Sequence, residues 1–318
     1  MSGKGVGLVL SGGGGKGAYH IGVWKALREL SVDINIKGVS GTSVGALNTV
    51  LFAQGDYYLA EGVWKSISSD IILKLDFKKL LLKLVTMGVL KGNLYTLSLI
   101  LSDVYGGGLF SREGLLEIID EYVDLYDIKN NELDLFATAY NINTLSVDYL
   151  CLNNRKIDSI KKVLLATSAL PIIFDKEKVD GNVYIDGGVK DNIPIKPLYD
   201  KGFRTFIVVH LSRNSVVDKE KFKDANIIEI VPSNDQGDLI NGTLDFSKEG
   251  INKRIDQGYN DALKVLKPIY EMGLIQAKLG LTLHNFKKDE FRFRQEKEKI
   301  IKDRKSIKSE LDKLLKTY

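Results

Sequence analysis

The stretch GVGLVLSGGGGKGAYHIGVWKALREL, residues 5–30, decides the fold of this chain. Its apolar run at 5–10 predicts a buried strand, and residues 17–30 carry apolar side chains at helical spacing. Between them, Gly12–Gly17 holds five glycines among six residues. Glycine lets a ligand approach the backbone closely, at an entropic cost to folding. We therefore predict a strand, a glycine loop that exposes its amides, and a helix.

A second unit of the same kind follows directly. Residues 34–40 predict a strand and residues 44–53 a helix, with Gly41-Thr42-Ser43 between them. Two consecutive strand-helix units favour an α/β fold, a three-layer α/β/α sandwich around a mostly parallel sheet. Later strands are expected at 135–140, 146–152, 183–185, 204–211 and 226–231, and later helices at 160–168, 246–266 and over much of the last 50 residues.

The composition indicates an ordinary folded globular protein. Of 318 residues, 44% are hydrophobic and 27% charged, and 30 glycines accompany only 5 prolines. The single Cys151 excludes an intramolecular disulfide and a cysteine-rich metal site. We recognise no secretory signal and no uncharged apolar run of about 18 residues. The expected location is the cytoplasm, with membrane contact at most peripheral.

The charge is small overall and concentrated near the C-terminus. A formal charge of +4 does not indicate a nucleic-acid-binding protein, and residues 285–318 hold 12 Lys or Arg against 7 Asp or Glu. Residues 70–101 mix leucine and isoleucine with five lysines. Such a segment can lie in a membrane interface or pack on the core with its lysines in solvent. We interpret 70–108 as a lid or membrane-facing segment.

Three functions compete for the glycine loop. A phosphate-binding P-loop fails, because Leu10 stands where its first glycine should be and Gly17 follows Lys16. Gly12, Gly14 and Gly17 match the dinucleotide fingerprint, but the second strand lacks the acidic residue that binds the ribose. The third function is an oxyanion hole, in which amides at a helix N-terminus meet negative charge.

The second turn carries a candidate nucleophile. Gly41-Thr42-Ser43-Val44-Gly45 matches the G-x-S-x-G elbow and falls between a strand and a helix, the context that this motif requires. The amide of Val44 would add a donor to those of the glycine loop. Taken alone, Ser43 could equally be the cap of the following helix.

A serine nucleophile needs a base, and the chain has only three histidines. Asp186 is the other candidate, at the end of a predicted strand and before Gly187 and Gly188. An aspartate with an ordinary pKa near 3.9 is a poor base at neutral pH, so burial must raise its pKa. Without such a role, Asp186 would be a turn residue.

Together these motifs resemble the patatin-like phospholipase family. The resemblance rests on the glycine loop, the Gly41–Gly45 elbow, the Asp186-Gly187-Gly188 triplet and Ala166–Pro171 (ATSALP), and it extends over residues 5–266. It implies a patatin-like acyl hydrolase domain at 1–266, which leaves a basic helical extension at 267–318. Lys16 departs from the arginine that the family often has in the loop.

The resemblance implies a lipid acyl hydrolase of the phospholipase A or lysophospholipase type, with an acyl-lipid substrate. The sequence has no calcium loop and no ligand cluster of histidines and carboxylates, so we expect neither cofactor nor metal. Ser43 would be the nucleophile and Asp186 the base of a catalytic dyad. The implied oxyanion hole comprises Gly12, Gly13, Gly14, Gly15, Lys16, Gly17 and Val44, supported by Gly41, Gly45, Gly187 and Gly188.

Two alternatives remain open. An ordinary α/β-hydrolase would use Ser43, Asp186 and His210 as a triad, whose order along the chain is correct. The fold could also serve as a lipid- or protein-binding module without turnover.

Overall fold

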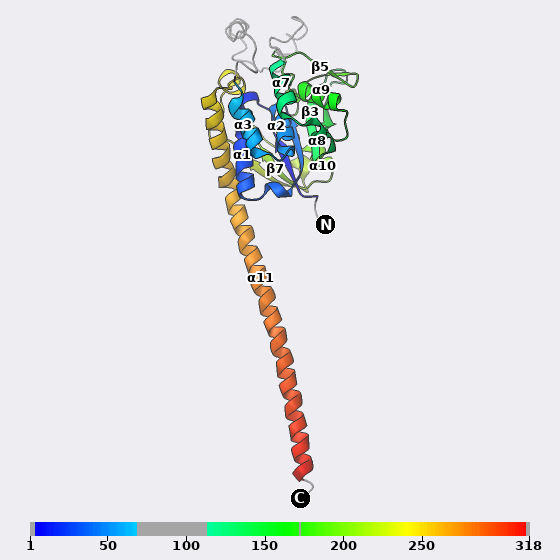
Figure 1. The fold of residues 1–318 in the computed structure, drawn as a ribbon, viewed down its shortest axis with the longest axis vertical. Helices are drawn as coiled ribbons and strands as arrows, with labels where there is room; N and C mark the ends of the chain where they lie inside the picture. The colour runs from blue at the N-terminus through cyan, green and yellow to red at the C-terminus, as the bar shows by residue number, and fades with distance from the viewer. Residues whose placement is uncertain (1–3, 69–112, 172, 316–318) are drawn as a thin grey trace. The chain divides into compact units, whose positions relative to one another are not determined.

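The computed structural model describes residues 4–68, 113–171 and 173–315 (Figure 1). The chain divides into two compact units, Met1–Val265 and Leu266–Tyr318. The segment 70–108, expected as a lid, lies outside the described residues.

The described part of the first unit contains one eight-stranded sheet, in the order β5-β6-β3-β2-β1-β7-β8, with β4 paired to β3. The neighbouring strands β3 and β2, β2 and β1, β1 and β7, and β7 and β8 run parallel. Strand β3 is antiparallel to β4 and to β6, and β5 is antiparallel to β6. The expected mostly parallel sheet is thus confirmed. The strands are β1 (Val6–Leu10), β2 (Ile36–Thr42), β3 (Asp134–Asn141), β4 (Ser146–Cys151), β5 (Glu177–Val179), β6 (Asn182–Asp186), β7 (Thr205–Val209) and β8 (Asn226–Ile230).

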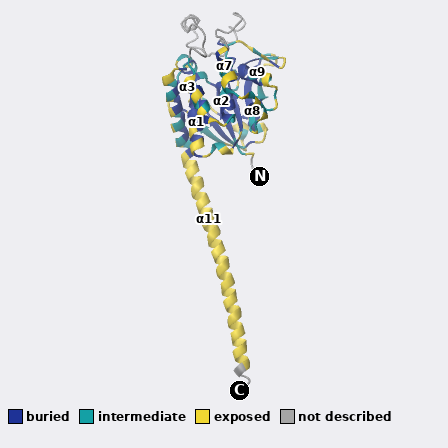
Figure 2. Ribbon diagram, in the orientation of Figure 1, coloured by how far each residue is buried: buried dark blue, intermediate teal, exposed yellow. Residues whose placement is uncertain are grey.

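Helices cover both faces of this sheet. The described α-helices are α1 (Ala18–Glu29), α2 (Val44–Ala53), α3 (Tyr57–Ser66), α7 (Glu113–Tyr122), α8 (Leu125–Asn130), α9 (Ile157–Thr167), α10 (Lys196–Asp200) and α11 (Lys248–Leu315). Side chains alternate along β1, so Leu8 and Leu10 face α1 and α2, while Val9 packs with Leu198 of α10 on the other face. The three layers are those expected, and the central strands β1, β2, β3 and β7 are largely buried between the helices (Figure 2).

The first turns of α11 pack tightly on α1. A Cβ on Gly22 would lie 1.9 Å from the carbonyl oxygen of Ile255, and one on Gly258 would lie 2.1 Å from that of Tyr19. The two backbones therefore approach more closely than any larger residue would allow. The Tyr19 hydroxyl also donates a hydrogen bond to Asp261, at 3.2 Å.

The C-terminal helix differs from the sequence-based expectation in its extent. We predicted a helix at 246–266 followed by further helix, whereas α11 is one element that contains Pro268. A proline inside a helix removes one backbone hydrogen bond but need not end it.

Candidate active site

Ser43 occupies a strained turn between β2 and α2. It is the N-cap of α2 with φ 56° and ψ −127°. Positive φ is uncommon for a residue that has a Cβ, and such strain clusters at functional sites. The turn leaves Ser43 half-buried at the wall of a cavity.

The glycines of the elbow are required by close backbone contacts. A Cβ on Gly41 would lie 2.2 Å from the carbonyl carbon of Gly45, and one on Gly45 would lie 2.1 Å from the carbonyl oxygen of Leu10. Both distances are too short for any side chain. The glycines therefore let α2 begin directly above the ends of β1 and β2, which places Ser43 beside the glycine loop.

We expect Gly45→Ala to destabilise the protein by about 3 kcal/mol, because the methyl group must displace the backbone of Leu10. Gly62→Ala is the matched control, since Gly62 lies in α3 and no described residue comes within 4 Å of its added Cβ. It should raise stability by up to about 1 kcal/mol through helix propensity. Urea unfolding of both variants measures the difference, and equal effects would contradict the packing argument.

The sheet brings Asp186 to Ser43 along one edge of β3. Ala139 of β3 pairs with β4 on one side and with Asp186 of β6 on the other. The preceding residue, Thr138, pairs with Thr42 of β2, and β4 again occupies the opposite side. Strands β2 and β6 therefore share one edge of β3 and meet end to end. Ser43, the residue after β2, and Asp186, the last residue of β6, therefore become neighbours, although they lie far apart in the sequence.

The Asp186 carboxyl group is buried, with 2% of its residue surface exposed. It accepts a 2.7 Å hydrogen bond from the N–H of Gly188. Burial raises its pKa to about 6, while hydrogen bonds from the Ser43 side chain and from Gly188 act in the opposite direction. An ionised carboxylate is therefore available near neutral pH, and it is more basic than an exposed aspartate.

The sequence did not single out two residues that hold this geometry. The Thr167 hydroxyl accepts a 2.9 Å hydrogen bond from the N–H of Ser43 and donates one of 2.5 Å to the Thr138 carbonyl. Asn192 pairs with the backbone of Gly12, through contacts of 3.1 and 3.2 Å. Thr167 lies in the ATSALP motif and Asn192 in the segment after Asp186. Neither motif indicates which backbone group its side chain binds.

The glycine loop presents only part of its backbone to Ser43. Gly12, Gly13 and Gly14 line the same cavity as Ser43 and Val44. The N–H of Gly12 is donated to Asn192. Within the described residues, no acceptor is recorded for the N–H groups of Gly13, Gly14 or Val44. These three amides are consequently available to a ligand.

In the rest of the loop, Gly15 and Lys16 contact the segment before α11, and Gly17 packs against α2. A Cβ on Gly15 would lie 2.2 Å from the Asp245 carbonyl oxygen, and one on Gly17 would lie 2.6 Å from the Val44 side chain. The Lys16 ammonium donates a 2.6 Å hydrogen bond to the Gly237 carbonyl. Gly15, Lys16 and Gly17 are not among the described residues that line the cavity.

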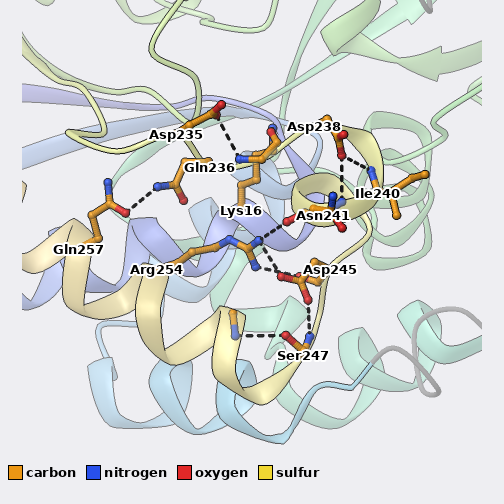
Figure 3. Close-up of polar contacts among 12 residues, drawn as sticks. Lys16, Asp235, Gln236, Asp238, Ile240, Asn241, Asp245, Ser247, Arg254 and Gln257 are labelled. Atoms are coloured by element: carbon orange, nitrogen blue, oxygen red, sulfur yellow. Dashed lines mark hydrogen bonds and ion pairs between the residues drawn. The ribbon is translucent and has the colours of Figure 1, made fainter. Parts of the chain in front are cut away.

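Lys16 belongs to a polar network under the loop (Figure 3). Burial lowers the pKa of Lys16, and Asp235 opposes this shift. Arg254 of α11 donates to Asp245 at 2.8 Å and to the Asn241 carbonyl at 3.1 Å, as Figure 3 shows. Through the bond between Lys16 and Gly237, the network connects the segment before α11 to the glycine loop.

The cavity beside Ser43 has a volume of about 380 Å³ and mostly apolar walls. Its volume is within the range of small-molecule sites. Ser43, Asp186 and Asn192 form a polar group at one end of the cavity, and Asn48, Ser168 and Thr243 are the other polar side chains of a lining that is otherwise mostly apolar. The apolar side chains come mainly from α2, α3, α7 and the segment before α11, and include Leu47, Leu51, Trp64, Leu115, Ile119, Leu244 and Phe246.

The histidines of the first unit have other partners. The His210 Nε2 lies 3.0 Å from Glu229, and burial lowers the pKa of His210. His20 Nδ1 lies 3.1 Å from the Asn48 amide, and burial lowers its pKa to about 3. Neither is among the described residues that line the cavity with Ser43.

The described residues contain no candidate metal site and no candidate membrane-spanning helix. No group of three or more His, Cys, Asp and Glu there could hold a metal ion. No helix in the described ranges is long and apolar enough to cross a membrane.

Comparison with known proteins places these features in a family. The chain is 25% identical over 249 residues to lysophospholipase NTE1 of Cryptococcus neoformans. The aligned region covers 76% of this chain and 12% of that protein. It is 29% identical over 211 residues to lysophospholipase NTE1 of Kluyveromyces lactis, and this aligned region covers 66% of this chain and 13% of that protein. Both matches therefore span only a small part of a longer relative.

The solved structure of VipD from Legionella pneumophila aligns with 83% of this chain and 67% of its own, at 15% identity and a TM-score of 0.43. The sequence model of the family described as patatin-like phospholipase matches residues 8–199, more than half of the chain. The chain belongs to the patatin-like phospholipase family.

Proposed function

We propose that the protein is a lipid acyl hydrolase that uses Ser43 and Asp186 as a dyad. The observation that carries this proposal is the meeting of a serine on a strained elbow with a buried carboxylate at the polar end of an apolar cavity. The family and the lysophospholipase relatives support hydrolysis of lipids.

In the proposed reaction, the Asp186 carboxylate accepts the proton of the Ser43 hydroxyl as the serine oxygen attacks the ester carbonyl. The C–O bond to the leaving alcohol then breaks, and Asp186 returns the proton to that alcohol. Asp186 then accepts a proton from a water molecule as the water oxygen attacks the acyl-enzyme carbonyl. The bond to the Ser43 oxygen breaks, Asp186 returns the proton to that oxygen, and the fatty acid is released.

The N–H groups of Gly13, Gly14 and Val44 are the proposed donors to the oxyanion. Gly13, Gly14 and Val44 line the cavity, and their N–H groups have no acceptor among the described residues. Preorganised donors of this kind are often the largest contribution to such catalysis. Lys16 is better suited to supporting the loop, because its ammonium group is bonded to Gly237.

The apolar cavity favours a substrate with a fatty acyl chain, and its polar end fits the ester at Ser43. We propose phospholipids or lysophospholipids, reached by peripheral contact with a membrane surface. The function is tested by incubating the full chain with vesicles of phosphatidylcholine and with lysophosphatidylcholine, and measuring released fatty acid by mass spectrometry. No release from either lipid, nor from a p-nitrophenyl ester, would favour a binding module.

His210→Ala separates the dyad from a Ser-His-Asp triad. We expect this variant to retain activity on a p-nitrophenyl ester within about threefold, because His210 bonds to Glu229 and does not line the cavity. A triad would instead lose several orders of magnitude when its histidine is removed. His20→Ala is the matched control for loss of a buried histidine. A large loss specific to His210→Ala would contradict the dyad.

A further inference from the structure

The helix of the second unit carries a regular row of exposed apolar side chains. Within the described part of α11 after Val265, one apolar residue recurs every seven positions, and each is between 58% and 70% exposed. An exposed apolar row of this length on a single helix needs a partner to cover it. We call these residues the d row: Met272, Leu279, Phe286, Phe293, Ile300 and Ile307.

A second row has one member three residues before each member of the first, and a last member, Leu311, four residues after Ile307. It contains apolar residues near both ends and charged residues in the middle. The two rows alternate at spacings of three and four, an average of 3.5 residues, which is the period of a left-handed coiled coil. We call these residues the a row: Ile269, Gln276, Leu283, Glu290, Lys297, Arg304 and Leu311.

The residues that flank this seam carry opposite charges on its two sides. The positions just before the a row, called g, are acidic in the second half of the helix: Asp289, Glu296, Asp303 and Glu310. The positions just after the d row, called e, include the basic residues Lys287, Arg294 and Lys308. In coiled coils these flanking positions set the choice of partner and its orientation.

We propose that this helix pairs with a second copy of the same chain in a parallel, two-stranded coiled coil. In a parallel pair, a g residue faces the e residue five positions later on the other helix. Asp289 then meets Arg294 of the second copy, and Asp303 meets its Lys308, with both pairs repeated by symmetry. An antiparallel pair would place acidic g residues against each other and basic e residues likewise. The charge pattern is therefore self-complementary only in the parallel orientation.

The charged members of the a row favour two strands. Glu290 is paired within its own helix to Arg294, at 2.6 Å, which offsets the approach of two glutamates in that layer. Lys297 and Arg304 can bury their aliphatic stems and keep their charged ends in water. More strands would enclose these charges more completely, and burying unpaired charge is costly. In each chain the first unit, Met1–Val265, precedes the helix of the second unit. In a parallel pair, both first units are therefore connected to the same end of the coiled coil.

The mass of the full chain in solution tests the pairing. We expect a dimer at about 20 µM by sedimentation or light scattering, and a monomeric wild type would overturn the proposal. Phe293→Glu should raise the dimer dissociation constant roughly 1000-fold or more, because two charges enter the seam. Phe291→Glu is the matched control, since Phe291 is 61% exposed against 64% for Phe293 but lies outside both rows. Equal effects of the two changes would contradict the seam.

The orientation is tested by cross-linking. In a Cys151→Ser background, Met272→Cys places one cysteine near the start of the d row. A parallel pair brings the two copies of this position together, so we expect a disulfide-linked dimer in mild oxidant. In an antiparallel pair they lie at opposite ends of the seam, and a dimer that does not cross-link would overturn the parallel arrangement. The Cys151→Ser chain alone is the control and should not cross-link.

Discussion

Ser43→Ala is expected to reduce ester hydrolysis by about 10⁴-fold or more, leaving the protein folded. The serine oxygen is the proposed attacking atom, and no other group can replace it when the hydroxyl is removed. Alanine fits the site, because Ser43 is half-buried and its backbone N–H keeps the bond to Thr167. The measurement is kcat/KM on a p-nitrophenyl ester, with thermal unfolding as the check on the fold.

The matched control for this prediction is Ser11→Ala. Ser11 follows β1 as Ser43 follows β2, but it is fully buried, and its hydroxyl has no hydrogen-bond partner in the described part of the chain. It does not appear among the described residues of the cavity wall. Its replacement should change kcat/KM less than threefold. A fluorophosphonate probe should label the wild type and Ser11→Ala but not Ser43→Ala. Labelling of Ser43→Ala would place the nucleophile elsewhere.

The sequence predicted the sheet well because its strands have strong local signals. The apolar run before the glycine loop became β1. The strand predicted at 34–40 became β2, which begins and ends two residues later, at Ile36 and Thr42. The glycines themselves also predicted close packing, which α2 shows above β1 and β2. The parallel order of the sheet followed from consecutive strand-helix units.

Other parts of the site depend on long-range contacts that no local pattern encodes. The cavity walls from α3 and α7 were not predicted as helices, although they supply Trp64, Leu115 and Ile119. Strands β2 and β6 meet on one edge of β3, and β4 occupies the other edge. The sequence indicated that Ser43 and Asp186 could cooperate, but the reason they meet is this topology.

Asp186→Asn is expected to reduce kcat/KM by about 10³-fold and to remove its dependence on pH near 6. A neutral amide cannot accept the serine proton, and general-base catalysis typically contributes between about 10² and 10⁴. In the wild type, the base must be ionised and its pKa is about 6. The kcat/KM value should therefore rise about tenfold per pH unit below 6 and level off above it. A profile that is flat from pH 4.5 to 8 would contradict the role of Asp186 as the base.

The same substitution should stabilise the protein at alkaline pH. The unfolded carboxyl loses its proton near 3.8 and the folded one near 6, so between these values the folded state binds more protons. Stability then falls as the pH rises through this window, by a total of about 3 kcal/mol for a shift of this size. Asparagine carries no charge to bury, and its carbonyl oxygen can still accept the Gly188 N–H.

Urea unfolding should therefore give Asp186→Asn a free energy of unfolding at pH 8 that exceeds the wild-type value by up to about 3 kcal/mol. The difference should disappear near pH 4, where the wild-type carboxyl is protonated in the folded state. A variant that is less stable than the wild type at pH 8 would show that the ionised carboxylate contributes to folding. The expected gain instead means that the protein holds a destabilising charge beside Ser43, and a buried base of this kind is what a serine without histidine requires.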